Sequence, residues 1–285
     1  MKTWFVTGAS SGFGAALARA ALARGDQVVL AARRAADLEA LATPFGGRAL
    51  PVALDVTDAA ARSAAVAAAH ERFGRIDVLA NIAGRGSLGA AEEFSATQLR
   101  EQMELNFFAA AELTRAVLPG MRAQGTGHVL QLTSIGGLIA AAGFAPYCAS
   151  KYALEGWSEA LADEVRHFGI RVTIVEPGAF RTEFAEAKNM RPAQPINAYR
   201  PLIAPVEDYL YGTSGQQPGD PERAAALMLA VVDDPAPPLR LLMGVDAWQA
   251  WEAKHTAMTA ELSAWRARGE ATGFPDAAVL PIAGR

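Results

Sequence analysis

Short apolar runs alternate with longer amphipathic stretches along most of the chain. The short runs are rich in aliphatic and β-branched residues and are bounded by glycine or polar residues, a pattern typical of strands buried on both faces. They predict seven strands, at residues 3–7, 27–32, 48–55, 76–81, 128–133, 171–176 and 239–243. The alanine-rich stretches between them predict helices. This alternation indicates an α/β fold, a doubly wound parallel sheet with helices on both faces.

Three residues mark ends of the predicted helices. Gly25 is expected to close the first helix, because glycine readily adopts the left-handed conformation that follows many helix C-termini. Asp58 and Ser95 are expected at the starts of later helices, where their side chains can accept hydrogen bonds from free N–H groups.

The regular pattern breaks down in residues 180–220, which contain scattered Pro, Asn, Tyr and Gly residues. Long irregular segments inside compact domains are usually lids or binding loops. We therefore expect residues 180–220 to form a substrate lid.

After the last strand, residues 245–268 predict a helix that carries several large apolar residues on related faces. Helical periodicity favours packing in the core or contact between subunits for these side chains. They are Trp248, Trp251, Met258, Leu262 and Trp265.

Composition limits the classes of protein to consider. A chain of 285 residues that is 51% apolar can bury one large core, so residues 1–285 are expected to form a single domain. The formal charge of −4 and the absence of a basic stripe argue against nucleic acid as a partner. The only cysteine, Cys148, cannot form an intrachain disulfide, and the four histidines have no ligand spacing, so no metal site is expected. Without an apolar stretch suited to a signal peptide or membrane span, a cytoplasmic protein with no membrane partner is expected.

The first predicted strand runs directly into a glycine-rich turn, Thr7-Gly8-Ala9-Ser10-Ser11-Gly12-Phe13-Gly14. Gly8 permits a tight turn, Gly12 lets the backbone approach a pyrophosphate, and Gly14 lets the next helix pack closely on the strand. The start of that helix offers free N–H groups and the positive end of its dipole to phosphates. The turn adds three more residues to this expected dinucleotide site: Ser10, Ser11 and Phe13.

At the end of the second strand the chain has Ala31-Ala32-Arg33-Arg34. Dinucleotide folds that prefer NAD carry an acidic residue there for the adenosine ribose, and no carboxylate is available in this segment. Guanidinium groups bind phosphate in a bidentate manner, so Arg33, helped by Ser11 or Arg34, suits the 2′-phosphate of NADP. We expect NADP(H) rather than NAD(H), with solvated arginines as the alternative.

The order of the motifs resembles the short-chain dehydrogenase/reductase family. The resemblance covers residues 3–182 and implies a Rossmann fold and an oxidoreductase. It is carried by the glycine-rich turn, by Asn81-Ile82-Ala83-Gly84 after the fourth strand, by Asn106, by Ser134 after the fifth strand, and by Tyr147-Cys148-Ala149-Ser150-Lys151. Ile82 stands where the family has a second asparagine.

The same resemblance implies further contacts with the cofactor. One group follows the third strand and holds the adenine edge; a second follows the fourth strand near the ribose; a third follows the sixth strand and orients the nicotinamide carboxamide. In that order they are Asp55 and Val56; Asn81, Ala83 and Gly84; and Pro177, Gly178, Phe180 and Thr182.

The chemistry is expected to depend on Tyr147 and Lys151, which lie one helical turn apart and point to the same side. A free tyrosine titrates near about 10, and a neighbouring cation lowers that pKa. In the direction of reduction, Tyr147 is therefore expected to donate a proton to the carbonyl oxygen of the substrate. Lys151 and the positive nicotinamide of an oxidised cofactor are expected to lower its pKa, and Lys151 is also expected to hold the nicotinamide ribose. Ser134 is expected to bind the same substrate oxygen.

Asn106 lies within a predicted helix, although asparagine is a poor helix former. It is either a buried and satisfied amide or, as the resemblance implies, part of a kinked turn whose water contacts Lys151. Both interpretations can hold together.

The expected walls of the substrate site are largely apolar, which favours a hydrophobic ketone, aldehyde or secondary alcohol. They comprise residues 85–88 and 138–144 with Phe184, Met190, Tyr199, Tyr209 and Tyr211. The C-terminal part resembles hydroxysteroid and retinol dehydrogenases more than acyl-carrier ketoreductases, and a homodimer or homotetramer is expected.

Two other interpretations remain open. One is a catalytically silent cofactor-binding sensor or scaffold of the same fold, although such a protein has no need of all four catalytic residues. The other is sugar-nucleotide epimerase or dehydratase chemistry, against which the glycine spacing and the lack of a large C-terminal domain argue.

Overall fold

The computed structural model describes residues 1–285 except 186–188, 275–277 and 279–285. Its centre is a parallel sheet with the strand order β3-β2-β1-β4-β5-β6-β7. The strands are β1 (Thr3–Thr7), β2 (Gln27–Ala32), β3 (Ala49–Ala53), β4 (Val78–Asn81), β5 (Gly127–Leu132), β6 (Ile170–Pro177) and β7 (Arg240–Met243). All seven strands begin within two residues of their predicted starts, so the doubly wound α/β fold is confirmed.

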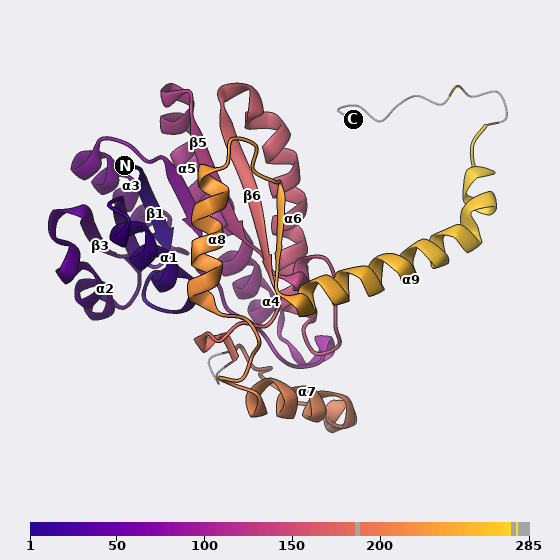
Figure 1. Ribbon diagram of the computed structural model, residues 1–285. Helices are drawn as coiled ribbons and strands as arrows, with labels where there is room; N and C mark the ends of the chain where they lie inside the picture. The colour runs from indigo at the N-terminus through magenta and orange to yellow at the C-terminus, as the bar shows by residue number, and fades with distance from the viewer. Residues whose placement is uncertain (186–188, 275–277, 279–285) are drawn as a thin grey trace.

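Helices cover both faces of the sheet (Figure 1). One layer contains α1 (Gly12–Ala23), α2 (Ala35–Ala42) and α8 (Pro221–Asp233), and the other contains α3 (Ala59–Phe73), α5 (Ala109–Gln124) and α6 (Ala145–Val165). The remaining helices are α4 (Ala96–Met103), α7 (Arg200–Gly212) and α9 (Val245–Glu270).

The alternation of side chains along each strand explains how the sheet packs against both helical layers, because successive side chains point to opposite faces of a sheet. Trp4 and Val28 pack into the core beneath α1 and α8, whereas their neighbours Phe5 and Val29 pack into the core beneath α3 and α5. All four side chains are fully buried. Both faces of the sheet must therefore be apolar, as the continuous apolar runs predicted.

The expected helix boundaries agree with the structure. Asp58 begins α3 and accepts hydrogen bonds from the N–H groups of Ala60 and Ala61. Ser95 begins α4 in the same way, with a bond from the N–H of Gln98. Gly25 follows α1 with a φ of +101°.

Two C-terminal segments differ from expectation. The segment 180–220, which was predicted to be irregular, contains the helix α7, and Pro205 lies inside this helix. Residues 186–188 of the segment lie outside the described residues. The helix expected at 245–268 is present as α9. The prediction that its large side chains pack in the core is wrong, because Trp248, Leu262 and Trp265 are 52%, 64% and 62% exposed. The spacing of apolar residues predicted the helix but not the contacts that its faces make.

A doubly wound sheet offers a binding crevice where its strand order reverses, here between β1 and β4. The loops after these strands carry the motifs of the candidate site. Among the described residues, no helix has the length and apolar character needed to cross a membrane.

Candidate active site

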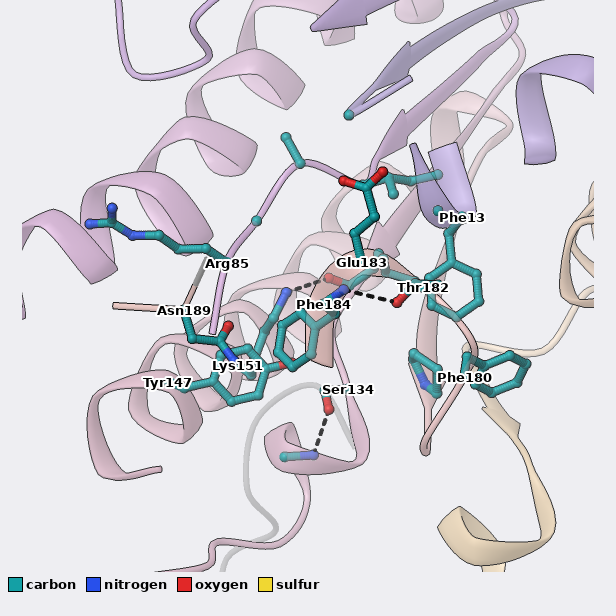
Figure 2. Close-up of a pocket in the computed structure, with 18 of the residues that line it drawn as sticks. Phe13, Arg85, Ser134, Tyr147, Lys151, Phe180, Thr182, Glu183, Phe184 and Asn189 are labelled. Carbon is teal, nitrogen blue, oxygen red and sulfur yellow. Dashed lines mark hydrogen bonds between the residues drawn. The ribbon is translucent and has the colours of Figure 1, made fainter. Parts of the chain in front are cut away.

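A cavity of about 1050 Å³ opens at the carboxyl ends of the strands. Residues at or just after the ends of six strands line it, including Gly8, Ala32, Leu54, Ile82, Leu132 and Pro177. Figure 2 shows part of this cavity, with Phe13 and Phe180 on one side and Tyr147, Lys151 and Ser134 on another. The topology thus brings the predicted motifs together around one space.

The glycine-rich turn has the geometry that its sequence requires. Gly8 and Gly12 adopt positive φ values of +67° and +52°, which L-residues with side chains rarely adopt. A β-carbon at Gly14 would collide with the carbonyl oxygen of Gly8, so this glycine allows α1 to pack against the turn. The Ser11 side chain does not cap α1, which leaves the N–H groups of the first helical turn open to the cavity.

Two arginines line the cavity where β2 ends. Arg34 forms ion pairs with Asp37 at 2.5 Å and Glu183 at 3.6 Å and donates a hydrogen bond to the Ser10 hydroxyl. Arg33 forms no hydrogen bond or ion pair with another described residue, and its charge helps to lower the pKa of Asp55. Its exposed guanidinium group is therefore available to an anionic ligand.

Asp55 and Val56 also line this end of the cavity. The Asp55 carboxylate accepts hydrogen bonds from the backbone N–H and the hydroxyl of Thr57. These bonds stabilise the ionised form and lower the pKa of Asp55. The carboxylate is thereby fixed in an acceptor state at the cavity wall.

Tyr147, Ser134 and Lys151 meet at the other end of the cavity (Figure 2). The Lys151 Nζ atom donates a hydrogen bond to the carbonyl of Leu132 at 2.8 Å and lies 5.8 Å from the centre of the Tyr147 ring. The Ser134 hydroxyl accepts a hydrogen bond from the N–H of Gly136 at 3.0 Å. Strand β5 thus positions the serine while α6 positions the tyrosine and the lysine.

Burial dominates the titration of Tyr147 and Lys151. It raises the pKa of Tyr147, although a hydrogen bond with Ser134 acts in the opposite direction. It lowers the pKa of Lys151 to about 8, with the charge of Glu155 opposing it. Desolvation is thus the main influence on the pKa of Tyr147, and a lowering by Lys151 together with the positive nicotinamide of an oxidised cofactor stays a prediction.

Asn106 lies in a π-helical turn, Glu104–Phe108, between α4 and α5. Its amide oxygen accepts a hydrogen bond from the N–H of Arg85, and its amide nitrogen donates to the Arg85 carbonyl and the Ser150 hydroxyl. The side chain is thus a buried, satisfied amide within a π-helical turn, and a water that joins it to Lys151 stays a prediction. Its contacts join the loop after β4 to α6 next to Lys151.

The Asn81 side chain points away from the main cavity, and the assignment of this residue to the cofactor site stays a prediction. Its amide nitrogen donates hydrogen bonds to the Ala110 carbonyl, the Thr114 hydroxyl and the Gln131 side chain. These partners hold the side chain towards α5, so that Ala83 and Gly84 line the main cavity but Asn81 does not. Strand alternation explains this, because Asn81 still belongs to β4 and points towards one helical layer.

The segment after β6 also reaches the cavity. Pro177, Gly178, Phe180 and Thr182 line it, and Phe180 packs against Phe13 with ring centres 5.0 Å apart. Asp246, at the start of α9, accepts a hydrogen bond from the N–H of Ala179 at 2.6 Å. This carboxylate was not predicted, since its contact joins segments 67 residues apart.

The expected substrate walls are partly found. Arg85, Phe184 and Tyr209 line the cavity, as do Ile139, Ala141 and Phe144 from the segment 138–144. Met190, Tyr199 and Tyr211 do not. Met190 pairs with Ser87, the Tyr199 hydroxyl donates to Glu92, and Tyr211 packs against Arg191. Two buried amides that sequence reasoning missed, Asn189 and Gln217, line the cavity instead.

Sequence reasoning also missed a buried ionic cluster behind Lys151, formed by Glu155, Glu176 and Arg240. The Arg240 Nη1 atom lies 2.5 Å from Glu155 and 3.3 Å from Glu176. The Thr133 hydroxyl, adjacent to Ser134, donates to Glu155 at 2.5 Å. Burial and the nearby charge of Glu155 raise the pKa of Glu176 to about 8. The only local signal was the position of Glu155 one helical turn after Lys151.

In the part of the chain that the structure describes, no group of three or more His, Cys, Asp or Glu side chains could hold a metal ion. Of the carboxylates that line the cavity, Glu183 pairs with Arg34, and Asp246 accepts a hydrogen bond from a backbone N–H group.

Comparison with known proteins places this site in a family. A family model described as short chain dehydrogenase matches residues 2–193. Oxidoreductase BOA17 of Botryotinia fuckeliana is 39% identical over 266 residues, which cover 93% of this chain and 97% of that protein. Retinol dehydrogenase 8 of Homo sapiens is 35% identical over 257 residues, which cover 84% and 80%. The last match agrees with the expected likeness to retinol dehydrogenases.

Solved structures lead to the same result. A short-chain dehydrogenase from Streptomyces avermitilis is 44% identical with a TM-score of 0.89, and the match covers 96% of this chain and 100% of that one. The closed form of a serine dehydrogenase complexed with NADP+ is 27% identical with a TM-score of 0.73, covering 85% and 94%. Because the family model spans more than half of the chain and these relatives match most of its length, the chain belongs to the short-chain dehydrogenase family of oxidoreductases.

Proposed function

We propose that the protein is an NADP(H)-dependent oxidoreductase that transfers hydride between the nicotinamide and a hydrophobic ketone, aldehyde or secondary alcohol. One observation carries the proposal: a single cavity joins the open N-terminus of α1 to the side chains of Ser134, Tyr147 and Lys151. A nicotinamide-dependent reaction needs groups that bind the phosphates of the cofactor and groups that transfer a proton to or from the substrate. Both kinds of group line this one cavity.

The cavity wall supports a dinucleotide with a 2′-phosphate. The turn at Gly12 and the uncapped start of α1 suit the pyrophosphate, since N–H groups and the helix dipole both attract anions. Arg33 lies at the end of β2 without a hydrogen bond or ion pair to another described residue, and the segment Ala31-Ala32-Arg33-Arg34 contains no carboxylate. A solved relative that binds NADP+ adds support for this choice of cofactor.

A bound nicotinamide cofactor supplies or accepts the hydride. In the direction of reduction, Tyr147 donates its phenolic proton to the carbonyl oxygen of the substrate, and Ser134 donates a hydrogen bond to the same oxygen. Lys151 contributes a positive charge near the phenol and, with the ribose in place, a hydrogen-bond donor. In the direction of oxidation, Tyr147 accepts the proton of the alcohol.

The substrate class is inferred from the apolar side chains that line the cavity together with these groups. They are Ile139, Phe144, Phe184 and Tyr209. Pockets of this kind bind hydrophobic molecules and use a few polar groups to orient them. Residues 180–220 would close over the substrate as a lid. A cytoplasmic location and assembly as a homodimer or homotetramer stay predictions from the sequence.

Replacing Tyr147 by phenylalanine tests the proposal, because the change keeps the ring and removes only the hydroxyl. Turnover of an alcohol panel with NADP+ should fall by roughly two or more powers of ten, the scale of a positioned acid or base, while the dissociation constant for NADPH stays unchanged. Tyr152→Phe is the matched control, since Tyr152 lies on the same helix and its hydroxyl contacts the Leu138 carbonyl.

A Tyr147→Phe enzyme that oxidises its alcohol at the wild-type rate would refute the role of Tyr147. If the wild-type protein binds NADPH but turns over no member of a broad carbonyl and alcohol panel, the cofactor-binding sensor becomes the better interpretation.

A further inference from the structure

Helix α9 leaves the body of the protein soon after it begins (Figure 1). It spans Val245–Glu270, and Ala247 is its only buried residue in the part of the chain that the structure describes. At about 1.5 Å per residue the helix is roughly 39 Å long. Residues 252–270 of this helix are all exposed. Because most helical stability in proteins comes from the packing of an apolar face, this uncovered surface needs an explanation.

The large apolar residues of α9, together with His255, follow a strict spacing. Trp248, Trp251, His255, Met258, Leu262 and Trp265 are separated alternately by three and four positions. This 3-4 spacing places all six side chains in one narrow stripe, as in a two-helix coiled coil. Within that stripe, Trp248, Met258, Leu262 and Trp265 are at least 39% exposed. We call these six residues the α9 stripe.

The α9 stripe is complementary to itself when two copies run in opposite directions. Trp248 then faces the partner's Trp265, Trp251 faces the partner's Leu262, and His255 faces the partner's Met258. Each of these three facing pairs forms a layer that occurs twice about a twofold axis. Every residue of the α9 stripe therefore faces a residue of the partner's stripe. Self-complementarity of this kind is what a twofold homodimer interface requires.

The charges beside the stripe favour the same arrangement. Lys254 and Glu261 occupy equivalent positions on one flank of the stripe, seven residues apart. In an antiparallel pair Lys254 lies beside the partner's Glu261, and this contact occurs twice. In a parallel pair Lys254 would lie beside the partner's Thr259 and gain no ion pair. Antiparallel pairing also separates the two bodies, because each α9 is attached to its body at only one end.

We propose that α9 is an assembly arm that pairs with α9 of a second copy of this chain as an antiparallel two-helix coiled coil through the α9 stripe. The pairing buries the exposed indole rings and joins two bodies by elements outside the α/β layers. It does not depend on the reaction assigned to the cavity.

Sedimentation of the full-length chain over a range of concentrations tests the arm. Wild-type species should contain an even number of copies. Leu262→Glu places a carboxylate in the centre of a layer, so it should raise the dissociation constant at least about tenfold and halve the mass of the species at low concentration. Ser263→Glu introduces the same charge on the adjacent position outside the stripe and should leave the mass unchanged.

A charge exchange tests the direction of pairing. Lys254→Glu alone and Glu261→Lys alone should each weaken association, and the double variant Lys254→Glu/Glu261→Lys should restore it. A monomeric wild type, or an oligomer that Leu262→Glu leaves intact, would overturn the proposal. If Leu262→Glu dissociates the protein but the double exchange restores nothing, α9 docks on another surface and antiparallel pairing is wrong.

Discussion

Replacing Glu176 by glutamine should make the stability of the protein less dependent on pH. The Glu176 side chain is fully buried on β6, with one oxygen 3.3 Å from Arg240 and the other without a hydrogen-bond partner among the described residues. Glu155, also buried, lies closer to the same guanidinium, at 2.5 Å. One cation thus serves two buried carboxyl groups, and Glu176 takes up a proton at neutral pH.

The sign of the effect follows from the pKa of Glu176. Burial and the charge of Glu155 raise it from 4.5 to about 8 in the folded protein. Between these two values the folded state holds a proton that the unfolded state has released, so stability is highest below the lower value and falls as the pH rises towards the upper one. At about 1.4 kcal/mol per pH unit, the loss between about pH 5 and pH 8 is roughly 4 kcal/mol.

Glutamine has the shape of the protonated acid and does not ionise. The free energy of unfolding of Glu176→Gln should therefore be close to that of wild type near pH 5 and exceed it by roughly 4 kcal/mol near pH 8. Urea unfolding at several pH values, followed by circular dichroism, measures the difference.

Glu159→Gln provides the control. Glu159 contacts the same arginine at 2.9 Å but its side chain is 37% exposed, so its removal should change the free energy of unfolding by less than about 1 kcal/mol at every pH. If the difference between Glu176→Gln and wild type is constant from pH 5 to pH 8, Glu176 is ionised throughout and this account of the buried cluster is incorrect.

Three further predictions concern the cavity. NADPH should bind at least about tenfold more tightly than NADH, a difference of about 1.4 kcal/mol, and Arg33→Asp should erode this preference; equal dissociation constants in the wild type would contradict it. Hydrogen exchange across residues 180–220 should slow when cofactor and substrate bind together, and unchanged exchange would count against a lid. Lys151→Ala should weaken cofactor binding and move the pH–rate profile of alcohol oxidation to higher pH, because the Tyr147 phenolate loses a neighbouring cation; an unshifted profile would exclude that role.

The positions of the strands along the chain and the glycine-rich turn could be predicted from the sequence because their causes are local. Burial on both faces appears as a continuous apolar run, and a helix start appears as a single capping side chain such as Asp58. The turn at Gly8 and Gly12 requires positive φ values, which only glycine adopts without strain. Each of these features depends on a few neighbouring residues.

Tertiary structure decided which side chains meet. Arg240 reaches Glu155 and Glu176 across 85 and 64 positions of the chain, and no local pattern indicates such a contact. The position of Asn81 in its motif suggested a ligand contact, but the side chain points from β4 towards α5, and its amide group hydrogen-bonds there. Periodicity predicted the α9 helix, whereas its exposure depends on where the chain leaves β7. Local patterning therefore determined the elements of this protein, and the packing of distant segments determined the partners and the ionisation of its buried charges.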